Sequence, residues 1–404
     1  MALHYKQPKY YDKFKCIGGK CTVSCCERWS IDWYGHEIKK VKDANPSDEL
    51  KELLEKSFKE KLDTFNFSDL RTDEEKRYSI ILKENGNCPF HNEEGLCMIQ
   101  KELGEEYLSE TCTIYPRKHF IHKENIIRSC YNSCPAVLDL LSEDINAVRL
   151  ESQYTESDFH YRLSSDGDKL KRLENYPVLN YRMELMEFYN KLITDRNVSL
   201  ETAIVLGALA SKRFTDAVEN NKIDEIPALI KEYEEKLKDK ATIKAIEEIK
   251  PNYLVQFKFV NNLLVTFLEN ADIQINISNL HDGEKLIPEN YARGIANLND
   301  TFKGREYFFK NVAANMLFDF NMPFRIQECS ILENYTYYAL AVASLKVIGV
   351  SVAEKGVDVE KKYKNAISMM GRAFAHNKTR TKNVIEYLKE HGFTSAAHVA
   401  LLIK

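Results

Sequence analysis

The chain is poor in glycine and proline, with 15 and 10 of these residues among 404. Residues that break helices are therefore rare, which favours helical structure. Charge of one sign is also missing, because the formal net charge is only −4. Without a basic stripe, nucleic acid is not an expected partner. Neither G-x-G-x-x-G nor G-x-x-x-x-G-K-[ST] occurs, which removes the common strand–loop–helix ways of holding a nucleotide.

Long hydrophobic runs are missing as well. The N-terminal residues contain no apolar segment typical of a secretory signal, and Lys346 interrupts the longest apolar stretch, Tyr337–Ala353. A stretch of this length is short for a membrane span and suits a helix in a protein core. We therefore expect a cytoplasmic protein without a transmembrane segment.

The patterns along the chain predict a mainly α-helical protein. Residues 1–150 are expected to form a cysteine-rich metal-binding domain with a small β-hairpin at 119–128. A polar connection over 151–176 leads to an all-helical domain over 177–404. Pro135 is placed to open a short helix, and Ser199 is placed to cap another.

Cysteine is concentrated in one part of the chain, where nine of the ten cysteines precede residue 135. In a cytosolic protein this density indicates a metal or iron–sulfur site, because the cytosol keeps thiols reduced. Thiolates are soft ligands that select zinc or iron–sulfur centres over magnesium and calcium. The candidate ligands are Cys16, Cys21, Cys25, Cys26, Cys88, Cys97, Cys112, Cys130 and Cys134.

The spacing of these cysteines does not identify the metal. Cys16-x4-Cys21-x3-Cys25-Cys26 lacks the repeated Cys-x2-Cys of a zinc ribbon. The adjacent Cys25 and Cys26 cannot easily point at one metal, so we expect them to lie in different environments. Nine thiols exceed the four that one centre needs. Either a second centre exists, or several thiols only pack.

Three strings in the first 141 residues resemble the bacterial flagellin lysine-N-methylase family. They are YYDKFKCIGGKCTVSCCERWSID, CPFHNEEGLCMIQKELGEEYLSETCTIYPR and SCYNSCPAVLDLL. The cysteine-rich part also resembles a wider family described as zinc- or iron-chelating. The resemblance implies methylation of surface lysines on flagellin with S-adenosylmethionine as the donor. It also implies a 4Fe-4S cluster on the cysteines, with zinc as the alternative metal. A non-catalytic zinc- or iron-binding accessory protein is the rival hypothesis, and an oligomer is compatible with either.

The resemblance leaves the ligands and the donor site open. We rank Cys21, Cys25, Cys112 and Cys134 first as cluster ligands. S-adenosylmethionine can be held without a glycine-rich loop if it chelates an iron of the cluster that has no cysteine ligand. Three cysteines then fill the other positions of the cluster. Arg117 would then pair with the carboxylate of the donor, and Tyr115 would flank its sulfonium. Alternatively, both residues only brace the hairpin that follows them.

Overall fold

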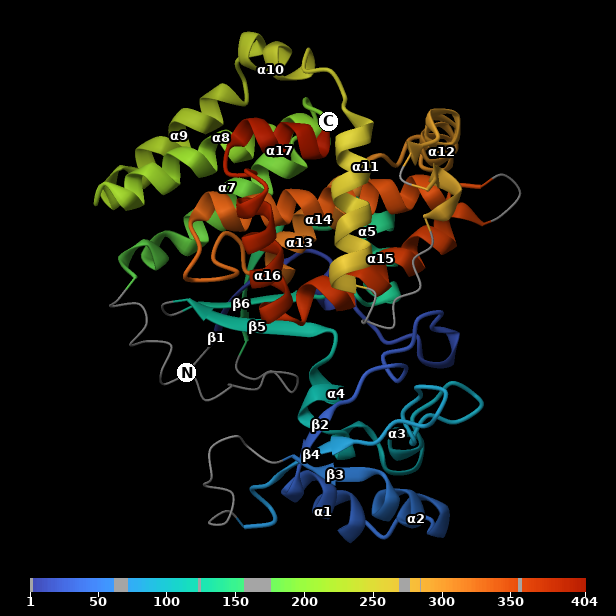
Figure 1. Ribbon diagram of the computed structural model, residues 1–404. Helices are drawn as coiled ribbons and strands as arrows, with labels where there is room; N and C mark the ends of the chain where they lie inside the picture. Colours follow the sequence, from blue (N-terminus) through green and yellow to red (C-terminus); the bar gives the residue numbers. More distant parts are fainter. Residues whose placement is uncertain are drawn as a thin grey trace. The chain divides into compact units, whose positions relative to one another are not determined.

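The computed structural model describes residues 3–61, 72–122, 125–155, 176–268, 277–283, 285–354 and 358–404. The predicted mainly helical fold is confirmed (Figure 1). The chain forms two compact units. The cysteine unit comprises Lys15–Lys118, and the helical unit comprises the described residues up to Phe14 and from His119 onward. These units differ from the predicted boundaries at residues 150 and 177, because the first residues of the chain join a sheet in the helical unit.

The cysteine unit combines short helices with a three-stranded antiparallel sheet of order β2-β4-β3. The strands are β2 (Asp32–Tyr34), β3 (Phe58–Glu60) and β4 (Arg77–Ile80). The helices are α1 (Gly35–Asp43), α2 (Asp48–Lys56), α3 (Met98–Leu103) and α4 (Glu110–Ile114). The unit has an apolar core of its own that includes Trp33, Leu50 and Ile99.

A four-stranded sheet of order β5-β6-β1-β7 lies along the helices of the helical unit (Figure 1). Its strands are β1 (Leu3–Pro8), β5 (Arg117–His122), β6 (Asn125–Cys130) and β7 (Leu150–Thr155). The predicted hairpin corresponds to the neighbouring strands β5 and β6. In β1, Tyr5 pairs with Ile126 in the parallel direction and with Gln153 in the antiparallel direction.

The sheet corrects the predicted connection over 151–176. Its first residues are not irregular, because they belong to β7 and hydrogen-bond to β1. The remainder, 156–175, lies outside the described residues. The predicted all-helical character of 177–404 also needs a small correction. A two-stranded antiparallel sheet joins β8 (His281–Asp282) to β9 (Lys285–Leu286).

Helices make up most of the rest of the helical unit. They are α5 (Pro135–Glu143), α7 (Arg182–Thr194), α8 (Leu200–Glu219), α9 (Ile226–Lys236), α10 (Lys240–Glu247), α11 (Tyr253–Asn262), α12 (Pro288–Thr301), α13 (Tyr307–Asp319), α14 (Ile331–Val352), α15 (Val359–Ala375), α16 (Lys378–Glu390) and α17 (Ala396–Ile403). Two predicted starts are confirmed. Pro135 is the first residue of α5, and the Ser199 hydroxyl accepts the Thr202 N–H at 3.1 Å.

Helix α14 is the centre of the helical unit and packs against α8, α12, α15 and α17 (Figure 1). It begins with a capping box, in which Ser330 and Glu333 each bond the backbone N–H of the other. Among the described residues, α14 is the one helix that is long and apolar enough to cross a membrane. However, 89% of its most apolar window is buried inside the protein. The prediction of a core helix around Lys346 is therefore confirmed.

Candidate functional site

Four cysteine side chains gather in the cysteine unit: Cys25, Cys88, Cys97 and Cys112. Every pair among them interacts electrostatically. They come from parts of the sequence that are up to 87 residues apart. The structure thus brings together four of the nine candidate ligands.

Backbone pairing places Cys25 beside Cys88. The Cys88 N–H donates to the Cys26 carbonyl at 2.7 Å, and the Arg28 N–H donates to the Gly86 carbonyl at 2.7 Å. Arg28 has a φ of 54°, so the chain turns sharply just after the two adjacent cysteines. Cys25 therefore joins the other thiols. Cys26 packs against the apolar core that contains Cys88 and that Cys97 also contacts. That Cys25 and Cys26 serve different environments stays a prediction.

Short helices position the other two thiols. Cys97 precedes α3, and backbone N–H groups of Ile99 and Gln100 in that helix donate to its sulfur. Cys112 lies in α4, which begins where the Ser109 hydroxyl accepts the Cys112 N–H at 3.2 Å. Both thiols are therefore held by elements with defined ends.

The surroundings of the four thiols disfavour negative charge in the absence of a cation. Burial raises the pKa of Cys88 to about 11, and the neighbouring Cys97 and Cys25 add to that rise. Burial also raises the pKa of Cys97 and of Cys112, again with contributions from the other thiols. A bound soft metal reverses this preference, because it stabilises thiolates directly.

The remaining predicted ligands in the cysteine unit have other surroundings. Cys16 is exposed, and the Cys21 thiol donates to the Val23 carbonyl at 3.3 Å. Their loop packs closely on the loop that precedes Cys97: a Cβ built on Gly19 would stand 2.5 Å from the Glu94 carbonyl oxygen. Gly19 thus permits the close approach of two cysteine-bearing loops.

Cys130 and Cys134 belong to the helical unit. Cys130 ends β6 and is fully buried in the apolar core. Its N–H donates to the Tyr10 hydroxyl at 2.9 Å, and its carbonyl accepts from Asn315 at 2.9 Å. Cys134 is the N-cap residue of α5. Of the four ligands ranked first, only Cys25 and Cys112 are therefore members of the four-thiol group.

The chemistry of the donors bears on the kind of metal centre. In the described part of the chain, no three His, Cys, Asp or Glu side chains are arranged to hold a single metal ion. Four thiolates are a ligand set that both a zinc site and an iron–sulfur cluster accept. The donor chemistry fits an iron–sulfur cluster.

Tyr115 and Arg117, the two residues predicted to bind the methyl donor, follow Cys112 closely in the sequence but differ in their surroundings. Tyr115 follows α4, and its ring meets the Trp29 ring edge-on with centroids 5.2 Å apart. Arg117 is the first residue of β5 and is partly buried. Tyr115 therefore belongs to an aromatic pair close in sequence to Cys112.

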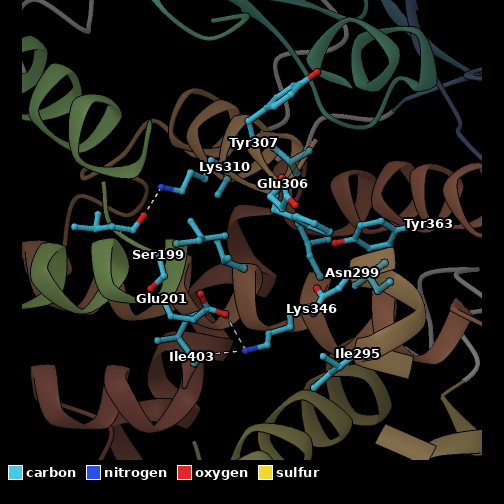
Figure 2. Close-up of a pocket in the computed structure, with 18 of the residues that line it drawn as sticks. Ser199, Glu201, Ile295, Asn299, Glu306, Tyr307, Lys310, Lys346, Tyr363 and Ile403 are labelled. Carbon is cyan, nitrogen blue, oxygen red and sulfur yellow. Dashed lines mark hydrogen bonds and ion pairs between the residues drawn. The ribbon is translucent and has the colours of Figure 1, made fainter. Parts of the chain in front are cut away.

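The helical unit contains a cavity of about 550 Å³ that the sequence did not reveal. Its walls come from the start of α8 and from α12, α13, α14 and α15 (Figure 2). Most of the lining is apolar, with Leu298, Phe309 and Leu345 among the side chains. A cavity of this size and character is typical of a site for a small organic ligand.

Five charged side chains line this cavity: Arg196, Glu201, Glu306, Lys310 and Lys346. Lys346 pairs with Glu201 at 3.0 Å. Burial by itself would raise the pKa of Glu201, but the charge and hydrogen bond of Lys346 outweigh it, so this pKa lies below its usual value. Lys310 donates to the carbonyls of Asp195 and Val198, the latter at 2.6 Å. Burial lowers the pKa of Lys310.

The hydroxyl of Tyr363 also reaches the cavity. Tyr363 is 2% exposed, and Figure 2 shows its hydroxyl directed toward the cavity. No described residue forms a hydrogen bond with that hydroxyl. The sequence held one signal for this site, namely Lys346 as a lone charge in an apolar stretch. It held none for Lys310 or Tyr363, which resemble ordinary helix residues.

Comparison with known proteins yields matches to one family. The FliB lysine N-methylase C-terminal domain matches residues 187–402. The chain is 26% identical over 159 residues to the lysine-N-methylase of Salmonella typhimurium. The aligned region covers 36% of this chain and 34% of that protein. The chain is 29% identical over 156 residues to the flagellar biosynthetic protein FliU of Salmonella muenchen. That aligned region covers 36% of this chain and 80% of that protein. The match thus spans about a third of the Salmonella typhimurium relative. No solved structure matches the chain.

Proposed function

The chain belongs to the family of the FliB lysine N-methylase C-terminal domain, and we propose that it is a protein-lysine N-methyltransferase acting on flagellin in the cytosol. The family match over more than half of the chain carries this proposal. Two relatives named for lysine methylation and for flagellar biosynthesis support the activity and the substrate. We take S-adenosylmethionine as the donor, as the resemblance of the cysteine-rich strings implies.

The methyl transfer requires a neutral lysine amine. A free lysine ε-amine has a pKa of about 10.4, so it is almost entirely protonated near neutral pH. When bound, S-adenosylmethionine supplies a methyl carbon that bonds to the lysine nitrogen, while the carbon–sulfur electron pair stays on sulfur and the amine proton is released. The protein has to hold the donor, orient the amine and keep water from the reacting atoms. The rate should therefore rise as the pH increases through the neutral range.

We propose the four-thiol group as the ligands of an iron–sulfur cluster. Cys25, Cys88, Cys97 and Cys112 supply four soft donors held by backbone pairing and short helices. This set keeps Cys25 and Cys112 from the sequence ranking and replaces Cys21 and Cys134. Zinc remains the alternative metal, because four thiolates also suit a zinc site. The resemblance of the cysteine-rich strings implies the cluster.

One experiment tests the activity directly. Full-length protein purified without oxygen is incubated with S-adenosylmethionine and flagellin, and the flagellin is analysed by mass spectrometry for methyl groups on lysine. Flagellin with every lysine reductively dimethylated beforehand serves as the matched control. Methylation of native flagellin alone supports the proposal. Metal-loaded protein that transfers no methyl group would instead favour the accessory-protein hypothesis.

A further inference from the structure

The count of thiols in the cysteine unit bears on where the donor binds. Chelation of S-adenosylmethionine to an iron requires that one iron of the cluster lack a cysteine ligand. The structure gathers four thiols, which is one for each iron of a four-iron cluster. A donor site away from the thiols is therefore more consistent with this geometry.

We propose that the cavity of the helical unit is this donor site, with Lys310 binding the carboxylate of S-adenosylmethionine and Tyr363 facing its nucleoside. The inference rests on the proposed function, because it takes the donor from there. It adds the location of the site and the residues that form it. The family match at 187–402 contains the α8, α12, α13, α14 and α15 residues that line the cavity.

Lys310 provides the first reason. Its hydrogen bonds go to two neutral carbonyl groups, and among the described residues no carboxylate forms an ion pair with it. The other lysine in the cavity is already paired with Glu201. Lys310 therefore offers a cation without an ion-pair partner among the described residues, which a ligand carboxylate would neutralise. Arg196, a second cation in the lining, bonds the Asn146 side chain at 2.7 Å.

The aromatic wall provides the second reason. Phe309 and Tyr363 both line the cavity, with ring centroids 6.0 Å apart. Flat heterocyclic rings bind well against such side chains. The Tyr363 hydroxyl, which points toward the cavity (Figure 2) and has no hydrogen-bond partner among the described residues, offers a donor or acceptor to the polar edge of a base. At about 550 Å³ the cavity has room for a ligand of nucleoside size with an amino-acid tail.

Calorimetry with two probes tests the assignment on the full-length protein. S-adenosylhomocysteine carries the carboxylate and is not turned over, whereas adenosine lacks the carboxylate. Lys310→Met should weaken S-adenosylhomocysteine binding by about tenfold or more, because a charge-assisted bond is lost, and leave adenosine binding within about twofold. Tyr363→Phe should weaken both ligands by about threefold.

The matched control is Tyr337→Phe, which removes a buried hydroxyl bonded to the Phe374 carbonyl outside the cavity lining. It should leave both affinities unchanged, and thermal unfolding verifies that each variant is folded. The proposed location of the donor site would be overturned if Lys310→Met weakened the binding of both ligands equally. It would also be overturned if Arg117→Ala weakened binding and Lys310→Met did not. If the wild-type protein binds S-adenosylhomocysteine but no cavity variant weakens it, only this inference fails. If the wild-type protein binds neither probe, the donor named in the proposed function fails as well.

Discussion

The hydroxyl group of Tyr335 lies directly against Gly207: a Cβ atom built on this glycine would stand 2.1 Å from the hydroxyl oxygen. Gly207 lies in α8 and Tyr335 lies in α14, so the contact fixes how closely the two helices approach. The ring of Tyr335 is fully buried and stacks on Tyr189 at 5.0 Å. The start of α8 and the later turns of α14 form walls of the cavity. The packing of these helices therefore bears on both stability and the proposed donor site.

Replacing Gly207 with alanine should destabilise the protein. The added methyl group would overlap the Tyr335 hydroxyl, and it would also stand 2.7 Å from the ring carbon that carries it. Overpacking of this kind costs about 1–3 kcal/mol, although alanine by itself favours a helix over glycine. Chemical denaturation measures the effect. A variant as stable as the wild type would show that α8 and α14 are less tightly packed than the structure indicates.

Tyr335→Phe should have the opposite effect. The Tyr335 hydroxyl is buried, and no described residue forms a hydrogen bond with it. Removing an unsatisfied buried polar group relieves a penalty of about 1–3 kcal/mol. Tyr338→Phe is the matched control, because the Tyr338 hydroxyl donates to the Ala313 carbonyl at 2.9 Å. Denaturation midpoints should rise for Tyr335→Phe and fall for Tyr338→Phe. Equal shifts of the two midpoints would contradict the view that the Tyr335 hydroxyl is unsatisfied and the Tyr338 hydroxyl is not.

The contribution of Glu360 to stability should disappear in acid. A hydrogen bond from Arg305 at 2.7 Å, together with Lys364 at 2.9 Å, lowers the pKa of Glu360 to about 2. A carboxyl whose pKa is depressed in the folded state stabilises the protein above its unfolded pKa of about 4.3. That contribution is lost as the pH falls from there toward 2. Glu360→Gln should therefore be less stable than the wild type at pH 7, with a gap that narrows below about pH 4. Urea unfolding midpoints of both proteins across this pH range test the prediction. A stability difference that stays constant with pH would refute it.

Single Cys→Ser substitutions should separate the thiols into two classes. Loss of iron from anaerobically prepared protein is expected for Cys25, Cys88, Cys97 and Cys112. Cys16→Ser is the matched control in the same unit, since Cys16 is exposed and outside the group. Elemental analysis gives the iron content, and absorption spectra identify the cluster. Iron retained in all four variants, or stoichiometric zinc without iron in the wild type, would rule out the proposed ligand set.

Metal removal should affect the cysteine unit before the helical unit. Binding at a site that the unfolded chain lacks contributes to folding free energy, and the core of the cysteine unit is small. The helical unit has a much larger core of its own. Limited proteolysis of chelator-treated protein should thus cut first within Lys15–Lys118, whereas untreated protein should resist there. Early loss of the C-terminal helices would contradict this expectation.

The amino-acid sequence determined the features that depend on local chemistry. Pro135 begins a helix because it needs no backbone donor at the first position, and Ser199 caps one because its hydroxyl satisfies a free N–H. The helix around Lys346 is buried because its apolar residues leave no polar face. The family resemblance was also visible, yet its motifs lie before residue 141 while the matched domain covers 187–402. These features depend on residues that are close together in the sequence, so predicting them requires no knowledge of long-range contacts.

Only the tertiary structure decided which distant residues meet. Nothing near Tyr5 indicates that β1 pairs with both β6 and β7, since its partners are more than 120 residues away. Spacing could not select Cys88 and Cys97 over Cys21 and Cys134. Cys25 comes beside Cys88 only through the turn at Arg28 and its hydrogen bond to Gly86. The cavity beside Lys310 likewise arises where several helices pack. Such features depend on how separate elements dock against one another, which is a property of the folded chain and not of any single segment.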